Sequence, residues 1–463
     1  MSNYPLIIQG GMGIAVSNWS LAKAVSMSGQ LGVVSGTAID AVAAMRLQCG
    51  DKFEHMRRSL LAFPVKEVGQ RIIDKFYNAN ETIKKTFKFT MPQFAMSHDK
   101  EDEIVASNFA EVYLAKEGHN GLVGINFLEK IQIPNLASIY GALLAGVDYI
   151  IMGAGIPREI PALIEKLVKH EPVECNLHMD NAKNEPRKLI FDPSRYGLKH
   201  LKLKKPKFLA IISSNILAQT LLKKSPVTPD GFIIENHTAG GHNAPPRNSE
   251  MNENGEPVYG EKDKVDLEKI KALNVPFWLA GGFGSKEGLK KALSLGAAGI
   301  QAGTVFAFSK ESGFSDDVKK KVLSAKDLHI KTDGFASPTG FPFKIAEISG
   351  TLSDQELYNK RERVCNLGYL RIPYEKANGF LGYRCAAEPV SAYERKGGKE
   401  ENTVNRKCLC NGLMAAAGYP LVTKDGTYEL PIITIGDDIA SIKNREFGYS
   451  AKDVVEEIIK GAE

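Results

Sequence analysis

The chain has 463 residues, more than the ~250–300 that one hydrophobic core usually serves, so we expect an appended segment beside the main domain. Hydrophobic residues make up 43% and charged residues 24%, a balance that excludes a mainly disordered protein. The net charge of +5 comes from 59 basic and 54 acidic residues spread along the chain, which argues against a nucleic-acid-binding protein.

Neither an export signal nor a membrane span is predicted. The first basic residue is Lys23, so the charged start of a secretory leader is missing. The longest apolar stretch, residues 133–157, contains Asn135 and Asp148, and a helix followed by a strand explains it better than a transmembrane helix. Six cysteines in a chain of this length do not form a disulfide scaffold. We therefore expect a cytoplasmic protein with no membrane partner.

Short β-rich runs, each punctuated by glycine or polar residues, recur along the chain. Most are followed by a helical pattern, such as residues 17–27, which Gly29 ends. Continuous apolar strands that alternate with helices indicate a parallel sheet covered by helices. Eight such units predict an α/β fold closed into a TIM-type (β/α)₈ barrel. The predicted strands are residues 6–9, 31–35, 122–127, 147–152, 208–213, 232–235, 277–280 and 299–302.

Two insertions interrupt this repeat. The first, about residues 40–120, carries helical patterns that end at Gly118, and the second, about residues 171–207, contains a possible hairpin. A long, turn-rich loop at about residues 243–265 contains Pro245-Pro246 and is a candidate lid.

The strand–helix rhythm stops after roughly Phe343. We therefore expect a barrel domain over residues 1–345 and a separate cap or tail over residues 346–463. The tail holds Cys365, Cys385, Cys408 and Cys410. Their spacing lacks the paired Cys-x₂-Cys arms of zinc sites, so buried or free thiols are expected and no metal is predicted.

Two glycine-rich turns follow the last two predicted strands. The first contains Gly281 and Gly282, and the second contains Gly303 and Thr304. In TIM barrels these turns commonly bind phosphate, because backbone N–H groups and the start of a short helix converge there. Glycines that only make tight strand-to-helix turns are the alternative, but the joint placement favours a phosphate site.

The first strand ends in a turn that resembles the start of a dinucleotide fingerprint. Val16 stands where a third glycine or alanine belongs, and the second strand ends without an acidic residue, so we reject a Rossmann site. Gly11 and Met12 are expected to leave room for the flat face of a bound ring, a plain turn being the alternative. Asn126, at the end of the third strand, can present its amide to a ring edge, or it simply forms a turn.

His242 is the candidate catalytic residue. It follows two glycines after the sixth strand, so it is expected at the catalytic face of the barrel, where it can exchange protons near neutral pH. A structural, hydrogen-bonding histidine is the alternative. His237 keeps that structural interpretation, and Arg247 either steadies an anionic substrate or is solvated.

Together these motifs resemble the nitronate monooxygenase family, formerly called 2-nitropropane dioxygenase, from the amino terminus to about Phe343. The resemblance implies a noncovalent FMN cofactor and a TIM-barrel oxidoreductase. It makes His242 the catalytic base. It assigns the remaining residues to the flavin: the phosphate to Gly281, Gly282, Gly303 and Thr304, and other flavin contacts to Gly11, Met12 and Asn126.

The long insertion, the lid and the tail depart from the compact family pattern and leave the substrate open. The tail, for example residues 384–389, is similar to that of enoyl reductases that act in trans on polyketide and polyunsaturated fatty-acid synthases. The leading hypothesis is oxidation of alkyl nitronates by O₂ to carbonyl compounds and nitrite. The alternatives are an NAD(P)H-dependent enoyl-thioester reductase with an acyl-carrier or synthase partner, and a non-catalytic flavin-binding scaffold.

Overall fold

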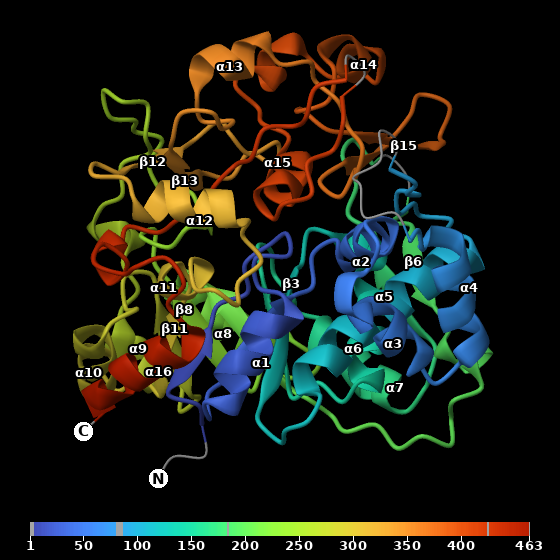
Figure 1. The fold of residues 1–463 in the computed structure, drawn as a ribbon, viewed down its shortest axis with the longest axis horizontal. Helices are drawn as coiled ribbons and strands as arrows, with labels where there is room; N and C mark the ends of the chain where they lie inside the picture. The colour runs from blue at the N-terminus through green and yellow to red at the C-terminus, as the bar shows by residue number, and fades with distance from the viewer. Residues whose placement is uncertain (1–3, 80–86, 183–184, 424–425, 463) are drawn as a thin grey trace.

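A computed structural model of the chain describes residues 4–79, 87–182, 185–423 and 426–462. At its centre lie eight parallel strands with helices around them (Figure 1). These strands are β1 (Ile7–Gln9), β2 (Gly32–Ser35), β3 (Val123–Leu128), β4 (Tyr149–Gly153), β7 (Lys207–Ile212), β8 (Gly231–Glu235), β10 (Phe277–Ala280) and β11 (Gly299–Ala302).

The sheet closes on itself. Its order, β1-β11-β10-β8-β7-β4-β3-β2, leaves β1 and β2 at the two ends, and backbone hydrogen bonds join them. The Gln9 N–H donates to the Leu31 carbonyl at 3.0 Å, and the Leu31 N–H donates to the Ile7 carbonyl at 3.1 Å. All eight strands lie where the sequence predicts them, with small differences at their ends, so the (β/α)₈ barrel is confirmed.

The strands have continuous apolar sequences because both of their faces are buried. Alternate side chains, among them Ile8, Val33 and Trp278, pack together inside the barrel, while Ile7 and Val34 pack against the surrounding helices. The indole N–H of Trp278 donates to the Pro5 carbonyl at 2.8 Å, which satisfies its one polar atom inside the core.

Helices follow most strands and cover the outside of the barrel. The helices that connect successive barrel strands, apart from those of the first insertion, are α1 (Trp19–Met27), α6 (Gln132–Leu144), α7 (Ile160–Val168), α8 (Asn215–Lys224), α9 (Leu267–Lys271) and α10 (Lys286–Ser294). Asn18 caps α1 by accepting the Leu21 N–H, and Ser285 caps α10 by accepting the Gly288 N–H.

Both insertions have the predicted character in the part of the chain that the structure describes. The first is helical, and its last helix ends just before Gly118, at φ +80°. Residues 80–86 of this insertion lie outside the described residues. Its helices are α2 (Ile39–Gln48), α3 (His55–Leu61), α4 (Lys66–Phe76) and α5 (His98–Lys116). The second insertion forms an antiparallel hairpin of β5 (Val173–Asn176) and β6 (Lys188–Phe191).

The segment after β11 builds a layer over the carboxyl ends of the barrel strands. A small antiparallel sheet joins β12 (His329–Asp333) and β13 (Phe343–Glu347) to β9 (Gly241–His242), and in it Phe343 pairs with His242. A hairpin joins β14 (Ile372–Glu375) and β15 (Leu381–Arg384). The helices are α11 (Thr304–Ala307), α12 (Asp316–Leu323), α13 (Gln355–Lys360), α14 (Val390–Arg395), α15 (Leu409–Ala416) and α16 (Ala451–Ile459).

The end of the chain returns to the barrel. Helix α16 packs between α1 and α10, as Figure 1 shows, and its residues Val454 and Ile458 belong to the main core. Ile433 and Ile435 share a core with Val16, which lies just before α1. Residues far along the sequence therefore lie over the carboxyl ends of the barrel strands, where function is expected.

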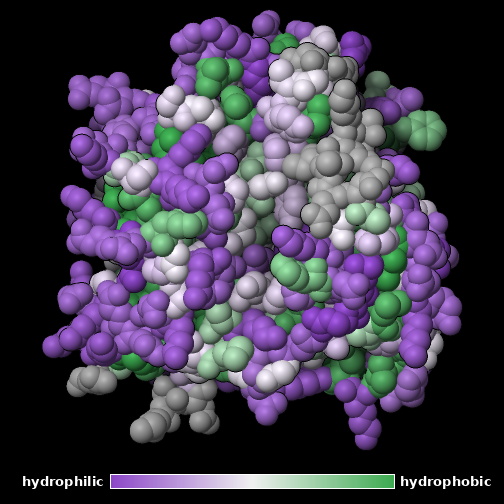
Figure 2. Space-filling view, in the orientation of Figure 1, coloured by the Kyte–Doolittle hydropathy of each residue, from purple (hydrophilic) through white to green (hydrophobic). Residues whose placement is uncertain are grey.

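The visible face in Figure 2 carries mainly hydrophilic side chains, with hydrophobic ones in small scattered groups. Among the described residues, no helix combines the length and the apolar character that a membrane crossing requires.

Candidate functional site

The glycine turns after β10 and β11 lie side by side because the two strands pair in parallel, with Ala280 opposite Gln301. Gly281 and Gly282 have φ values of +87° and +76°, in the left-handed region that glycine adopts without steric cost. The turns surround a small cavity of about 100 Å³, the cradle, lined among others by Gly10, Thr238, Gly240, Gly282, Gly303, Thr304 and Gly436.

Thr238 supplies the clearest sign that the cradle holds a ligand. Its hydroxyl oxygen is buried and has no hydrogen-bond partner among the described residues. Such a group typically costs ~1–3 kcal/mol, so a ligand that accepts its hydrogen would offset that cost. A Cβ placed on Gly281 would come within 2.7 Å of this oxygen. A side chain at residue 281 would therefore clash with this hydroxyl.

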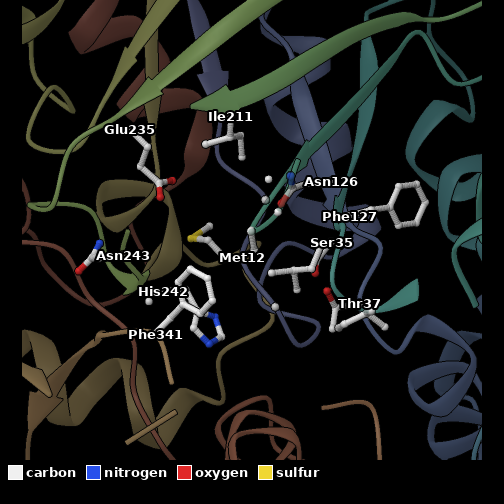
Figure 3. Close-up of a pocket in the computed structure, with 18 of the residues that line it drawn as sticks. Met12, Ser35, Thr37, Asn126, Phe127, Ile211, Glu235, His242, Asn243 and Phe341 are labelled. Carbon is white, nitrogen blue, oxygen red and sulfur yellow. The ribbon is translucent and has the colours of Figure 1, made fainter. Parts of the chain in front are cut away.

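A larger cavity of about 400 Å³ adjoins the cradle and shares Met12, Glu235 and Gln301 with it. This volume lies within the ~300–1,000 Å³ typical of small-molecule sites. Figure 3 shows Met12, Asn126, Glu235 and His242 placed around it. Most of the lining is apolar and comes from both the barrel and the C-terminal segment, including Ile14, Leu128, Ile211, Phe341, Tyr369, Leu370, Leu409 and Leu413.

The structure brings Gly11, Met12 and Asn126 together at this cavity. The Asn126 side-chain amide donates one N–H to the Ile151 carbonyl at 3.2 Å, which leaves Oδ1 and the second N–H available to a ligand. A Cβ on Gly11 would lie 2.3 Å from the Asn126 Cβ. The space that Gly11 provides is therefore occupied by Asn126 rather than left open to a ring.

His242 lines the same cavity. Its Nε2 lies 2.8 Å from the Ser337 hydroxyl, and its ring stands edge-on to Phe343 with centroids 4.7 Å apart. Burial, with a contribution from the charge of Lys130, lowers the pKa of His242 to about 3. The imidazole is therefore neutral at physiological pH, and its doubly protonated form is strongly disfavoured.

Glu235, at the carboxyl end of β8, is a candidate that the sequence reasoning missed. Its side chain lines the cradle, the 400 Å³ cavity and a third cavity described below. Burial raises the pKa of its carboxyl to about 7, the range in which a carboxylate works well as a proton acceptor or donor. The available signal was an acidic residue at the carboxyl end of an otherwise apolar barrel strand.

His237 and Arg247 do not reach the 400 Å³ cavity. They line a separate one of about 600 Å³ beneath the loop at residues 243–265, together with the cations Lys264 and Lys291. The His237 ring stacks on Tyr259 of that loop, with centroids 4.3 Å apart and planes 9° apart. This position agrees with the structural, loop-orienting role expected for His237.

The C-terminal segment closes the cradle through three hydrogen bonds that no local sequence pattern predicts. The Gly436 N–H donates to the Thr304 hydroxyl at 3.0 Å, and the Asp437 N–H donates to the Thr238 carbonyl at 2.9 Å. The Asp438 carboxylate accepts the Gly284 N–H at 3.0 Å. Burial raises the pKa of Asp438 above its usual range, although the hydrogen bonds from Gly284 and Ser441 act in the opposite direction.

This set of groups suits the phosphate of a flavin mononucleotide. Two adjacent glycine turns, the unpartnered Thr238 hydroxyl and the Thr304 hydroxyl, which accepts one hydrogen bond and can donate another, surround a space of phosphate size. The Gly284 N–H is not part of this donor set, because Asp438 already accepts it. The 400 Å³ cavity next to the cradle provides the apolar space that a ring system needs.

The four tail cysteines do not form a metal centre in the part of the chain that the structure describes, where no group of three His, Cys, Asp or Glu side chains is placed to hold an ion. All are free thiols. Cys385 and Cys408 pack against each other, and burial raises the pKa of Cys410 to about 12, so its thiol stays protonated.

Comparisons with known proteins agree with this site. Residues 191–335 match the family model described as nitronate monooxygenase. Probable nitronate monooxygenases of Bacillus subtilis and Staphylococcus haemolyticus are each 33% identical, over 102 and 110 residues. These alignments cover 22% and 23% of this chain, and they span only 28% and 29% of the length of those relatives.

Solved structures with a similar arrangement include FabK of Thermotoga maritima, with a TM-score of 0.49, 17% identity, and coverage of 99% of this chain and 92% of that one. The nitroalkane oxidase of Streptomyces ansochromogenes aligns with a TM-score of 0.46 and 14% identity, over 99% of this chain and 97% of its own. The matched residues 191–335 carry β7 to β12 with His242 and both glycine turns, so this part of the chain is similar to nitronate monooxygenases.

Proposed function

We propose that this protein is an FMN-dependent oxidoreductase that oxidises alkyl nitronates with O₂ to carbonyl compounds and nitrite. The observation that carries the proposal is the joining of a phosphate-sized glycine cradle to an apolar cavity that contains two proton-transfer candidates, His242 and Glu235. The match of residues 191–335 to the nitronate monooxygenase family supports the same reaction class.

The bound flavin would accept the electrons, and the chain would bind, orient and deprotonate the substrate. Gly281, Gly282, Gly303 and Thr304 would hold the phosphate, with Thr238 as an additional donor. Met12 and Asn126 would contact the ring, and Gly11, whose open side is filled by Asn126, would do so through its backbone. The neutral imidazole of His242 would take the α-proton from a nitroalkane that arrives in its neutral form.

A test combines the visible spectrum of the purified protein with its anaerobic reactions. We expect a yellow protein that releases FMN on heating and whose flavin absorbance bleaches on addition of an alkyl nitronate. Under air, the same substrate should drive O₂ uptake and nitrite release. Release of FAD, or failure to bind any flavin on reconstitution, would contradict the cofactor assignment.

An enoyl-thioester reductase is the second candidate, and the 600 Å³ cavity favours it. This space adjoins the candidate site at Glu235 and carries Arg247, Lys264 and Lys291 at its walls, which suits a long, phosphate-bearing reactant such as NAD(P)H or an acyl-carrier thioester. Bleaching by NADPH, followed by reoxidation with an enoyl thioester and not by a nitronate, would favour this function. Flavin binding without turnover of either substrate set would instead indicate the scaffold role.

A further inference from the structure

A continuous line of side-chain contacts runs from His242 away from the cavity. His242 Nε2 lies 2.8 Å from the Ser337 hydroxyl, and that hydroxyl lies 2.8 Å from the hydroxyl of Thr339. The Lys130 ammonium donates to the Thr339 hydroxyl over a longer 3.4 Å. Two side chains, those of Ser337 and Thr339, thus connect the Nε2 atom of the imidazole to Lys130, a lysine that follows β3.

The two hydroxyls are held in place by the C-terminal segment. The Thr339 N–H donates to the Ser337 hydroxyl, and one guanidinium nitrogen of Arg406 donates to the Ser337 carbonyl at 2.6 Å. The Lys407 N–H donates to the Ala336 carbonyl at 2.8 Å. A hydroxyl whose backbone is fixed on both sides loses little freedom when it forms a hydrogen-bonded chain.

Lys130 is a half-buried amine at the end of this line. Its ammonium lies 3.4 Å from the centroid of the Phe341 ring, and burial lowers its pKa to about 8 although the neighbouring Glu129 acts in the opposite direction. A fraction of the Lys130 amines is therefore uncharged near neutral pH. An uncharged amine can accept a proton, which an ordinary exposed lysine cannot do there.

A base at His242 needs such a partner. Because the ring is buried, it cannot keep a second proton, so a proton gained at one ring nitrogen must be matched by one lost at the other. The nitrogen on the far side already contacts Ser337. The line of hydroxyls therefore begins at the atom from which a proton has to leave.

We propose that Ser337, Thr339 and Lys130 form a proton relay that carries away the proton that His242 removes from the substrate. The α C–H bond of a nitroalkane breaks, its electron pair stays on the resulting nitronate, and the proton binds one ring nitrogen of His242. The hydrogen on Nε2 passes to Ser337, that of Ser337 to Thr339, and that of Thr339 to the uncharged amine of Lys130. His242 stays neutral, and Lys130 ends as an ammonium ion that balances the nitronate charge.

This inference rests on the proposed function, because the relay matters only when a proton is removed. Three variants interrupt it at different points: Ser337→Ala, Thr339→Val and Lys130→Met. Lys331→Met, on β12 and outside the relay, is the matched control. Each protein is loaded with FMN, and anaerobic flavin bleaching is followed with a neutral nitroalkane and, separately, with its preformed nitronate.

We expect each relay variant to lose about tenfold or more of its rate with the nitroalkane, and to keep the nitronate rate within about twofold, because acid–base assistance is worth ~10²–10⁴-fold in total and only its relayed part is removed. The control should keep both rates. An unchanged ratio of nitroalkane to nitronate rates in all three flavin-loaded relay variants would overturn the relay. A parent protein that bleaches with neither substrate would instead contradict the proposed function.

A second readout does not depend on turnover. An ammonium group has only hydrogens to donate, so with Lys130 charged the hydroxyls point from Thr339 to Ser337 to Nε2, and the ring hydrogen is on Nδ1. ¹⁵N NMR of labelled histidine, with His242 identified by its loss in His242→Asn, reports the tautomer. We expect mainly the Nδ1–H form in the parent at a pH well below the Lys130 pKa and a shifted ratio in Lys130→Met. The same ratio in both proteins would overturn the relay.

Discussion

The two sides of the candidate site are built in different ways. The cradle comes from turns that follow β10 and β11, two neighbouring strands, so it is local in sequence and its glycines are visible as a motif. The proton-transfer side joins Glu235 and His242 to Ser337 and Lys130, which come from distant parts of the chain. The shape of the cradle therefore depends on the backbone conformation of its glycines, whereas the pKa values of Glu235 and His242 depend on burial and tertiary contacts.

The largest effect is expected on the proton-transfer side. His242→Asn should lower the rate with a neutral nitroalkane by ~10²–10⁴-fold and leave the rate with the preformed nitronate nearly unchanged, because only the nitroalkane has an α-proton to lose. Stopped-flow flavin bleaching measures both rates on FMN-loaded protein. If the variant oxidises nitroalkanes as fast as the parent, His242 is not the base, and Glu235 becomes the leading candidate.

Glu235→Gln tests whether burial raises the pKa of the Glu235 carboxyl, on the proton-transfer side of the site. The folded-state pKa of about 7 lies above that of an exposed glutamate, so ionisation destabilises the fold increasingly as pH rises from the unfolded pKa to the folded one, and by a constant amount above it. The glutamine side chain cannot ionise, so the variant should be more stable than the parent at alkaline pH, by on the order of 3 kcal/mol, and the gain should vanish in acid. Urea denaturation across pH with FMN held at saturation gives this difference; a pH-independent difference would contradict the assigned burial effect.

Gly281→Val tests the cradle. The side chain would meet the Thr238 hydroxyl and would force a β-branched residue to φ +87°, so we expect flavin affinity to fall by about 10²-fold. Gly296→Val is the control, because Gly296 has a similar φ of +83° at the end of α10 but lies outside the cradle. Flavin titration followed by fluorescence quenching measures the affinity. Equal flavin retention in both variants would show that Gly281 only makes a turn.

The smallest effect is expected for Thr238→Val, which replaces the unpartnered hydroxyl by a methyl group of similar size. Flavin affinity should fall by about tenfold, since a hydrogen bond to a charged group contributes ~1.5–3 kcal/mol. The flavin-free protein should be as stable as the parent or slightly more so, because no internal hydrogen bond is lost. Thermal melts with and without FMN separate the two effects. Lower stability without flavin would indicate that Thr238 has a structural partner.

The local sequence pattern was sufficient to predict the barrel and a small set of the residues that line its cavities. Short apolar runs such as residues 277–280, which alternate with helical patterns, favour strands of a covered parallel sheet, and eight such units favour a closed barrel. The same reasoning placed Gly281, Met12, Asn126 and His242 at one end of it, because the carboxyl ends of parallel strands meet at one face.

Tertiary structure decided what those residues can do. The pKa values of Glu235 and His242 follow from burial beneath a C-terminal layer, and burial is a property of the folded assembly that a local sequence window does not contain. The contacts of Thr238 with Asp437 and of His242 with Ser337 join segments 95 or more residues apart, brought together by cores shared between the barrel and the end of the chain. The sequence by itself therefore determined the barrel and the positions of the cradle glycines. Only the tertiary structure decided the pKa values of Glu235 and His242 and the side chains that contact His242, because desolvation and hydrogen-bond geometry arise from packing.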